Sequence, residues 1–113
     1  MQRGEVYLAN FPFGDTAAMK LRPVLLLTGT VDTGTEVLVA YISSVVPSTP
    51  LSSDIVLDPA QTQHQSTRLK TKSVLRLHKL ATIHASSLQR RLGKITGTTQ
   101  QNVDAKLRVL LNL

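Results

Sequence analysis

Short segments in which apolar and polar residues alternate with a period of two occupy the first two thirds of this chain. In residues 5–10, Val6 and Leu8 fall on one face while Glu5 and Tyr7 fall on the other. Successive side chains of a β-strand point to opposite faces, so this alternation predicts strands and excludes an all-helical fold. Strands are predicted over residues 5–10, 24–28, 36–43, 54–57 and 73–77, and residues 80–83 form a further short apolar segment.

Turn-forming residues separate these segments. Gly, Thr and Asp fill residues 29–34, so the strands on either side are predicted to form a hairpin. Pro47, Pro50 and several serines connect residue 43 to residue 54, and residues 60–72 are expected to be polar and mobile.

Helical signals come late in the chain. Thr98 followed by Gln101 fits a capping box, and Val103, Leu107 and Leu110 repeat at the spacing of one helix face. One or two helical turns are also expected within residues 84–91. Short strands closed by one helix predict an α+β fold, a small and strongly bent antiparallel β-barrel with a C-terminal helix.

Composition limits the function classes. At 113 residues the chain is expected to form a single domain, residues 1–113. Without cysteine it has no disulfide or thiolate metal site, and its three histidines lack ligand spacing, so no metal or cofactor is expected. Apolar runs are too short to cross a membrane, and residues 1–5 do not begin a signal peptide. A cytoplasmic location is therefore expected, with no membrane partner.

Charge is distributed unevenly along the chain. Residues 1–58 hold three Lys or Arg and six acidic residues, whereas residues 59–113 hold ten and one. Between Asp58 and Asp104 there is no acidic residue. This half of the chain favours a polyanion or an acidic protein segment as partner, although a basic surface without a specific ligand remains an alternative.

Arg22 and the Ser43-Ser44 pair are the candidate reactive groups. Pro23 is predicted to be the first residue of its strand, which places Arg22 at the rim of the sheet. In an antiparallel hairpin the start of one strand faces the end of the next, so Arg22 is expected near residues 43 and 44. Alternation puts Ser43 on the face of Tyr41 and Ser44 on the opposite face.

A guanidinium beside a hydroxyl can bind a phosphodiester and stabilise the charge that develops during in-line displacement. If the ribose 2′-hydroxyl is the nucleophile, the substrate must be RNA and no metal is needed. The alternative for Arg22 is a solvated loop residue, and for the serines a turn cap.

The chain resembles the PemK/MazF family, the toxins of type II toxin–antitoxin modules. Five segments carry the resemblance in the family's order, and together they span almost the whole chain. They are residues 3–7 (RGEVY), 11–13 (FPF), 20–27 (KLRPVLLL), 40–43 (AYIS) and 73–83 (SVLRLHKLATI).

The resemblance implies an SH3-like barrel, a homodimer and an acidic cognate antitoxin. It also implies sequence-selective, metal-independent cleavage of single-stranded RNA that leaves a 2′,3′-cyclic phosphate and a free 5′-hydroxyl. In the family's pattern Arg22 acts on the scissile phosphate, and Ser43 assists as catalytic hydroxyl. The implied RNA-binding residues are Lys20, Ser44, Arg68, Lys70, Lys72, Ser73, Arg76 and His78.

Two departures from the family affect the chemistry. Some relatives have an acidic general base near the loop that precedes residue 73, but residues 59–103 contain no Asp or Glu. His78 or His64 would have to serve, or the proton would leave to water. Serine also replaces the threonine of many relatives at residue 43. A non-catalytic protein on the same fold, which binds RNA or a protein such as gyrase, therefore stays open as the alternative.

Overall fold

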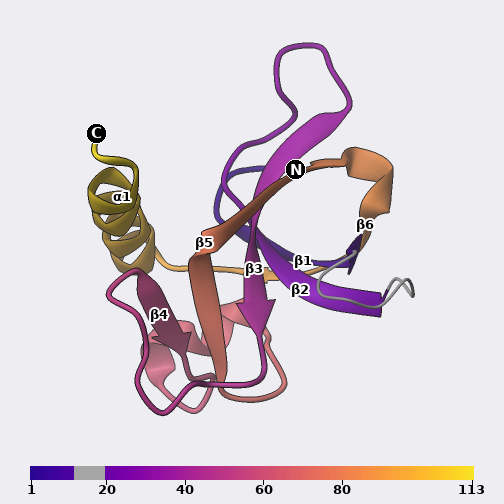
Figure 1. Ribbon diagram of the computed structural model, residues 1–113. Coiled ribbons are helices and arrows are strands. Elements are labelled where there is room, and N and C mark those ends of the chain that lie inside the picture. The colour runs from indigo at the N-terminus through magenta and orange to yellow at the C-terminus, as the bar shows by residue number, and fades with distance from the viewer. Residues whose placement is uncertain (12–19) are drawn as a thin grey trace.

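The computed structural model describes residues 1–11 and 20–113, and at Phe11 and Lys20 it describes the backbone alone. Six strands form one antiparallel sheet in the order β4-β5-β3-β2-β1-β6, followed by one α-helix (Figure 1). The strongly bent α+β fold with a C-terminal helix is confirmed, as an open sheet with β4 and β6 at its edges. Its elements are β1 (Glu5–Phe11), β2 (Lys20–Leu26), β3 (Glu36–Ser43), β4 (Asp54–Leu57), η1 (Thr62–Thr67), β5 (Ser73–His84), η2 (Ala85–Ser87), β6 (Leu88–Lys94) and α1 (Gly97–Leu111).

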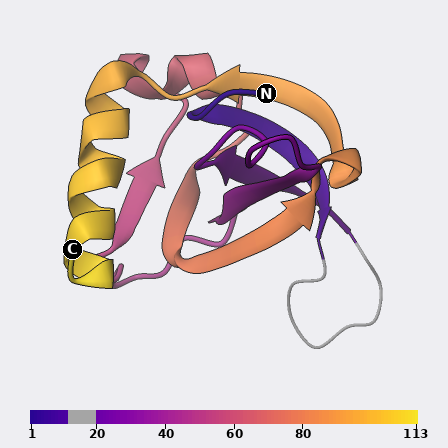
Figure 2. The same ribbon diagram turned by 90° about the horizontal axis from the view of Figure 1, so that it is seen from above.

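Apolar side chains line both faces of the bent sheet. Leu25, Ile42 and Leu75 are fully or almost fully buried on the face covered by α1, where Val103 of the helix joins the same cluster. On the other face Val24 and Val39 belong to a second, smaller cluster. Figure 2 shows α1 along one side of the molecule beside β4, leaving the second face uncovered by the helix.

β5 is bent where its pairing with β3 shifts. Ala40 pairs with Leu80, but the next residue, Tyr41, pairs with Arg76, so three residues of β5 have no partner on β3. Such a bulge bends and twists a strand. The strand predicted at residues 73–77 and the short apolar segment at 80–83 are therefore parts of one strand, β5.

Two segments in the second half of the chain differ in part from prediction. Residues 84–91 contain only the short η2 and then β6, which pairs with β1 with two register shifts. Residues 60–72 contain η1, where His64 and Thr67 are buried and the Thr67 hydroxyl donates to the His64 carbonyl at 2.7 Å. β6 depends on pairing with β1, and η1 depends on the burial of His64. Both are tertiary contacts that a local sequence pattern does not reveal.

Boundaries of two other elements also differ from prediction. β2 begins at Lys20, so Pro23 lies inside this strand and not at its start. The helix is capped by Thr96, whose hydroxyl accepts from the Thr99 amide at 3.2 Å, in place of Thr98. In the parts of the chain that the structure describes, no helix is long and apolar enough to span a lipid bilayer.

Candidate functional site

Arg22 and Ser43 occupy corresponding positions on neighbouring strands. β2 and β3 pair from Leu26–Val39 to Val24–Tyr41, and the same register continued for two residues aligns Arg22 with Ser43. Residues opposite each other in an antiparallel pair share a face. Both lie on the face of Val24 and Tyr41, which we call the Arg22 face, and both are half-buried.

Pro23 explains why the β2–β3 ladder ends there. Proline has no N–H to donate, and the ladder's first pair is at the residue after it, Val24. On its other side β2 still pairs with β1, where Ala9 is opposite Arg22. β1 therefore holds the Arg22 backbone in extended geometry although β3 does not pair with it.

Arg76 extends this face towards the sheet edge. It is opposite Tyr41 on β3 and opposite Asp54 on β4, so Tyr41, Arg76 and Asp54 share a face. The Arg76 Nε lies 3.0 Å from Oδ1 of Asp54, whose side chain is fully buried. Among the described residues, neither atom has a hydrogen-bond partner, so the contact is an ion pair.

Asp54 also contacts His78 and a backbone amide. Its Oδ2 accepts from the Leu51 amide at 2.8 Å, and its Oδ1 lies 4.0 Å from Nδ1 of His78. His78 is on the bulged part of β5 and its side chain remains 31% exposed. Sequence reasoning missed Asp54, which precedes the acid-free interval. The sequence signal that could have revealed it is an acidic residue at the first position of a strand whose other residues are all apolar.

The bulge also brings a lysine to this face. The Lys79 ammonium lies 5.7 Å from the centroid of the Tyr41 ring, a distance suited to a cation–π contact. The Ser43 hydroxyl accepts from the Val45 amide at 3.1 Å, so it also closes the turn after β3. The Arg22 face therefore carries the cations Arg22, Arg76 and Lys79 beside the Ser43 hydroxyl.

Ser44, as alternation predicts, lies on the opposite face from Ser43. It lines a cavity of about 200 Å³ that we call the Arg68 cavity. Leu8, Pro23, Leu69 and Leu92 give this cavity a mainly apolar lining, and Arg68, Lys70 and Arg90 supply three positive charges. Thr71 and the buried Ser73 complete it.

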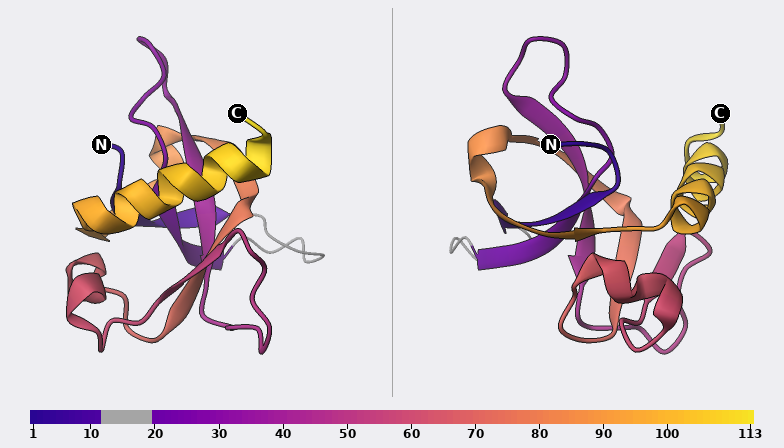
Figure 3. Two further views of the ribbon diagram at one scale, coloured as in Figure 1. Left: turned by 90° about the vertical axis from the view of Figure 1, so that its left-hand side faces the viewer. Right: turned by 180° about the vertical axis from the view of Figure 1, so that it is seen from behind.

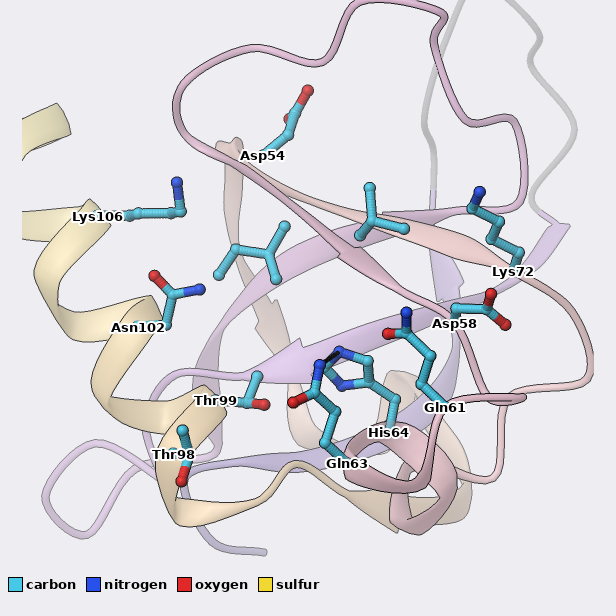
Figure 4. Close-up of a pocket in the computed structure, with 12 residues that line it drawn as sticks. Asp54, Asp58, Gln61, Gln63, His64, Lys72, Thr98, Thr99, Asn102 and Lys106 are labelled. Carbon is cyan, nitrogen blue, oxygen red and sulfur yellow. Dashed lines mark hydrogen bonds between the residues drawn. The ribbon is translucent and has the colours of Figure 1, made fainter.

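Lys72 lies elsewhere, at a polar cavity of about 470 Å³ between β4, η1 and α1 (Figure 4). Asn102 and Lys106 of α1 face Gln61 and Gln63 across it. His64 lies among them with its Nδ1 buried and without a hydrogen bond from the described residues. Burial lowers the pKa of His64 below its ordinary value, although the Asp58 carboxylate opposes this.

The predicted site residues thus fall into three groups. Arg22, Ser43 and Arg76 share the Arg22 face, with His78 beside Asp54 at its margin. The Arg68 cavity is lined by Ser44, Arg68, Lys70 and Ser73, and the polar cavity between β4, η1 and α1 is lined by Lys72. Lys20 is the first residue of β2, and its side chain lies outside the described residues. Within the described ranges, no three acidic, His or Cys side chains gather as a metal site would require.

Other solved structures share this fold, among them the following three. An endoribonuclease from a Mycobacterial species has 16% sequence identity and a TM-score of 0.74, covering 100% of this chain and 92% of its own. A second structure, an endoribonuclease in complex with its cognate antitoxin, also from a Mycobacterial species, has 16% identity and a TM-score of 0.74, with coverage of 100% and 96%. The Mycobacterium tuberculosis toxin MazF-mt6 has 23% identity and a TM-score of 0.75, with coverage of 96% and 97%. These TM-scores establish a common fold.

A search of curated protein sequences finds no significant match. The sequence matches the family described as PemK-like, MazF-like toxin of type II toxin-antitoxin system over residues 2–111, almost the whole chain. The bent antiparallel sheet and the C-terminal helix are those expected from the resemblance. This chain therefore belongs to the PemK/MazF family of type II toxin–antitoxin toxins.

Proposed function

We propose that this toxin is an endoribonuclease that cleaves single-stranded RNA without a metal ion. The observation that carries the proposal is the alignment of Arg22 with Ser43 on one face of adjacent strands, with Arg76 on the next strand. Diagonal neighbours on adjacent strands are about 7–8 Å apart, within reach of long side chains such as arginine. A single phosphodiester can therefore contact a guanidinium on one side and a hydroxyl on the other.

The reaction is an intramolecular displacement at phosphorus. The ribose 2′-oxygen forms a bond to phosphorus and loses its proton, while the bond to the 5′-oxygen breaks and that oxygen takes up a proton. The products are a 2′,3′-cyclic phosphate and a 5′-hydroxyl. Arg22 stabilises the negative charge that grows on the phosphoryl oxygens, and the Ser43 hydroxyl donates to one of them.

His78 is our candidate to receive the 2′-hydroxyl proton. It is exposed, and the Asp54 carboxylate 4.0 Å away can orient its ring and stabilise the imidazolium that forms. Asp54 thereby takes part of the role that the acid-free interval of residues 59–103 leaves vacant. The remaining cations would hold the flanking phosphates, as salt-sensitive contacts.

The same surface suits the partners that the family implies. The basic half of the chain would bind the acidic tail of a cognate antitoxin, which would compete with RNA for the same cations. We further propose that the toxin acts in the cytoplasm as a homodimer. Val109 of α1 and Leu113, two residues beyond the helix, are 81% and 86% exposed, and such apolar side chains are available for contacts with another chain.

Incubation of a long RNA with the purified toxin in EDTA tests the proposal, with fragment ends mapped. Metal-independent fragments that carry cyclic phosphates are expected. Arg22→Ala should abolish cleavage, a loss of at least about 100-fold given the worth of one charge-stabilising donor. Ser43→Ala should have a smaller effect, and Arg108→Ala, on exposed α1, should have none.

Cleavage by Arg22→Ala at the parent rate would refute the role of Arg22. Loss of activity in Ser44→Ala but not Ser43→Ala would mean that the hydroxyl acts from the other face. Intact RNA retained in a stable complex would instead support the non-catalytic alternative.

A further inference from the structure

The displacement at phosphorus needs a proton for the departing 5′-oxygen. An alkoxide is strongly basic, and an acid positioned to protonate it in the transition state typically contributes about 10²–10⁴-fold in rate. Arginine stays protonated in proteins, so Arg22 and Arg76 can stabilise charge but cannot give up this proton. With His78 as the candidate base, the Lys79 ammonium and the Tyr41 hydroxyl are the other acids on the Arg22 face.

The bulge in β5 gives Lys79 its place on this face. In a regular strand Lys79 would point away from the face of Arg76, because residues separated by an odd number lie on opposite faces. Residues 77–79 have no partner on β3, however, and the Lys79 ammonium lies 5.7 Å from the centroid of the Tyr41 ring. Tyr41 is the residue opposite Arg76. The bulge therefore reverses the alternation and brings Lys79 to the Arg22 face.

His78 and Lys79 are adjacent in sequence but lie against different strands. Nδ1 of His78 is 4.0 Å from Oδ1 of Asp54, on β4 at the sheet edge. Lys79 lies over Tyr41, on β3. β5 runs between β4 and β3 (Figure 1), so the base and the ammonium lean to opposite sides of it. In-line displacement places the attacking and leaving oxygens on opposite sides of phosphorus, and this arrangement suits it.

The Tyr41 ring positions the ammonium without taking its proton. An aromatic face attracts a cation through its quadrupole. Lys79 is exposed, and no acidic side chain of the described residues forms an ion pair with it. Its ammonium is therefore held over one ring and is still able to donate to a bound substrate.

We propose that Lys79 is the general acid of the cleavage reaction. As the bond between phosphorus and the 5′-oxygen breaks, the Lys79 ammonium transfers a proton to that oxygen and becomes a neutral amine. Lys79 then regains a proton from water, and His78 returns to water the proton that it took from the 2′-hydroxyl. This inference rests on the proposed ribonuclease function, because it assigns a step of that reaction.

A substrate with sulfur as the leaving atom tests this role. End mapping of a long RNA identifies a cut position, and a short RNA that spans it is made with either oxygen or sulfur at the 5′ position of the cleaved bond. A thiolate leaves without a proton, since a thiol is a far stronger acid than an alcohol. Lys79→Met should cleave the oxygen substrate at least about 100-fold more slowly than the parent protein. It should cleave the sulfur substrate at close to the parent rate.

Three further variants separate proton transfer from charge. Lys79→Arg keeps the positive charge but holds its proton, so it should also be slow on oxygen and restored on sulfur. Arg22→Ala should slow both substrates alike, because charge grows on the phosphoryl oxygens with either leaving atom. Lys106→Met, on α1, removes the same charge away from the Arg22 face and is the matched control, which should cleave both at the parent rate.

Several results would overturn the role of Lys79. An equal loss on both substrates in Lys79→Met would mean that this lysine only binds a phosphate, and cleavage of the oxygen substrate by Lys79→Arg at the parent rate would mean that charge alone suffices. A loss restored by sulfur in Tyr41→Phe, with none in Lys79→Met, would assign the proton to the Tyr41 hydroxyl.

Failure of the two proposals can be separated. If the parent protein leaves every RNA intact, the ribonuclease proposal fails and the role of Lys79 fails with it. If RNA is cleaved in an Arg22-dependent way while sulfur restores nothing in Lys79→Met, the role of Lys79 alone is wrong.

Discussion

The ion pair between Asp54 and Arg76 gives a stability prediction that the structure makes quantitative. The Asp54 side chain is fully buried, whereas 20% of the Arg76 side chain is exposed. Removing one partner of a buried pair costs about 3–5 kcal/mol, since the other charge is left without compensation. We expect Asp54→Asn to lower the free energy of unfolding by about 3 kcal/mol, the lower limit, because water can reach the remaining guanidinium.

Arg76→Met should cost more, about 4 kcal/mol, because the carboxylate it leaves behind has no contact with water. The double variant Asp54→Asn with Arg76→Met leaves neither charge. Its loss of unfolding free energy should therefore be smaller than the sum of the losses in the two single variants. The expected coupling is about 2 kcal/mol.

Urea unfolding of the four proteins at pH 7, followed by far-ultraviolet circular dichroism, measures this cycle. Equal slopes against urea concentration are needed for the comparison to be valid. A loss in the double variant that equals the sum of the two single losses to within about 0.5 kcal/mol would refute the reasoning, because it would mean that the two charges do not interact.

Two further predictions concern η1. Gly93→Ala should destabilise the fold by about 3 kcal/mol, because a Cβ at this position would meet the backbone of Ser66 and Thr67 and push η1 away from β6. Gly97→Ala should not destabilise it, since a Cβ there meets nothing within 4 Å. Equal unfolding midpoints for the two variants would contradict this prediction. Burial lowers the pKa of His64 in the folded chain, so the stability it contributes is complete above its unfolded pKa of about 6.5 and is lost as the pH falls. The loss of stability between pH 7.5 and pH 5 should thus be smaller in His64→Gln than in the parent or in the exposed control His84→Gln, and an equal loss in all three would exclude this role.

Most of the sheet could be predicted because its strands carry their own signals. Residues 37–42 form an apolar run rich in β-branched residues between turn-forming segments, so β3 has the predicted bounds, and the short apolar run of β4 likewise has the predicted bounds. β6 could not be predicted in this way, since its sequence, LQRRLGK, lacks alternation and is mostly exposed. Its extended form depends on pairing with β1, a partner 79 to 89 residues away in the chain.

The candidate site was predictable in part for the same reason. Hairpin geometry brings Arg22 and Ser43 to corresponding positions, and alternation separates Ser43 from Ser44. The role of Asp54 depends on pairing between β4 and β5 across the whole η1 segment, which no local pattern encodes. The Arg68 cavity likewise combines Arg90 from β6 with Leu8 from β1. The sequence therefore identifies the basic residues but does not show that they lie together.

The bend in β5 has a consequence for the dynamics of the toxin. Figure 3 shows this one strand continuing from the part of the sheet beside η1 towards the β2–β3 hairpin. Since both regions share a continuous backbone and a common partner in β3, neither can swing as a separate lobe. Amide hydrogen-exchange rates on the two sides of the bend should therefore change together when the stability of the protein changes, because the two sides open as a single cooperative unit.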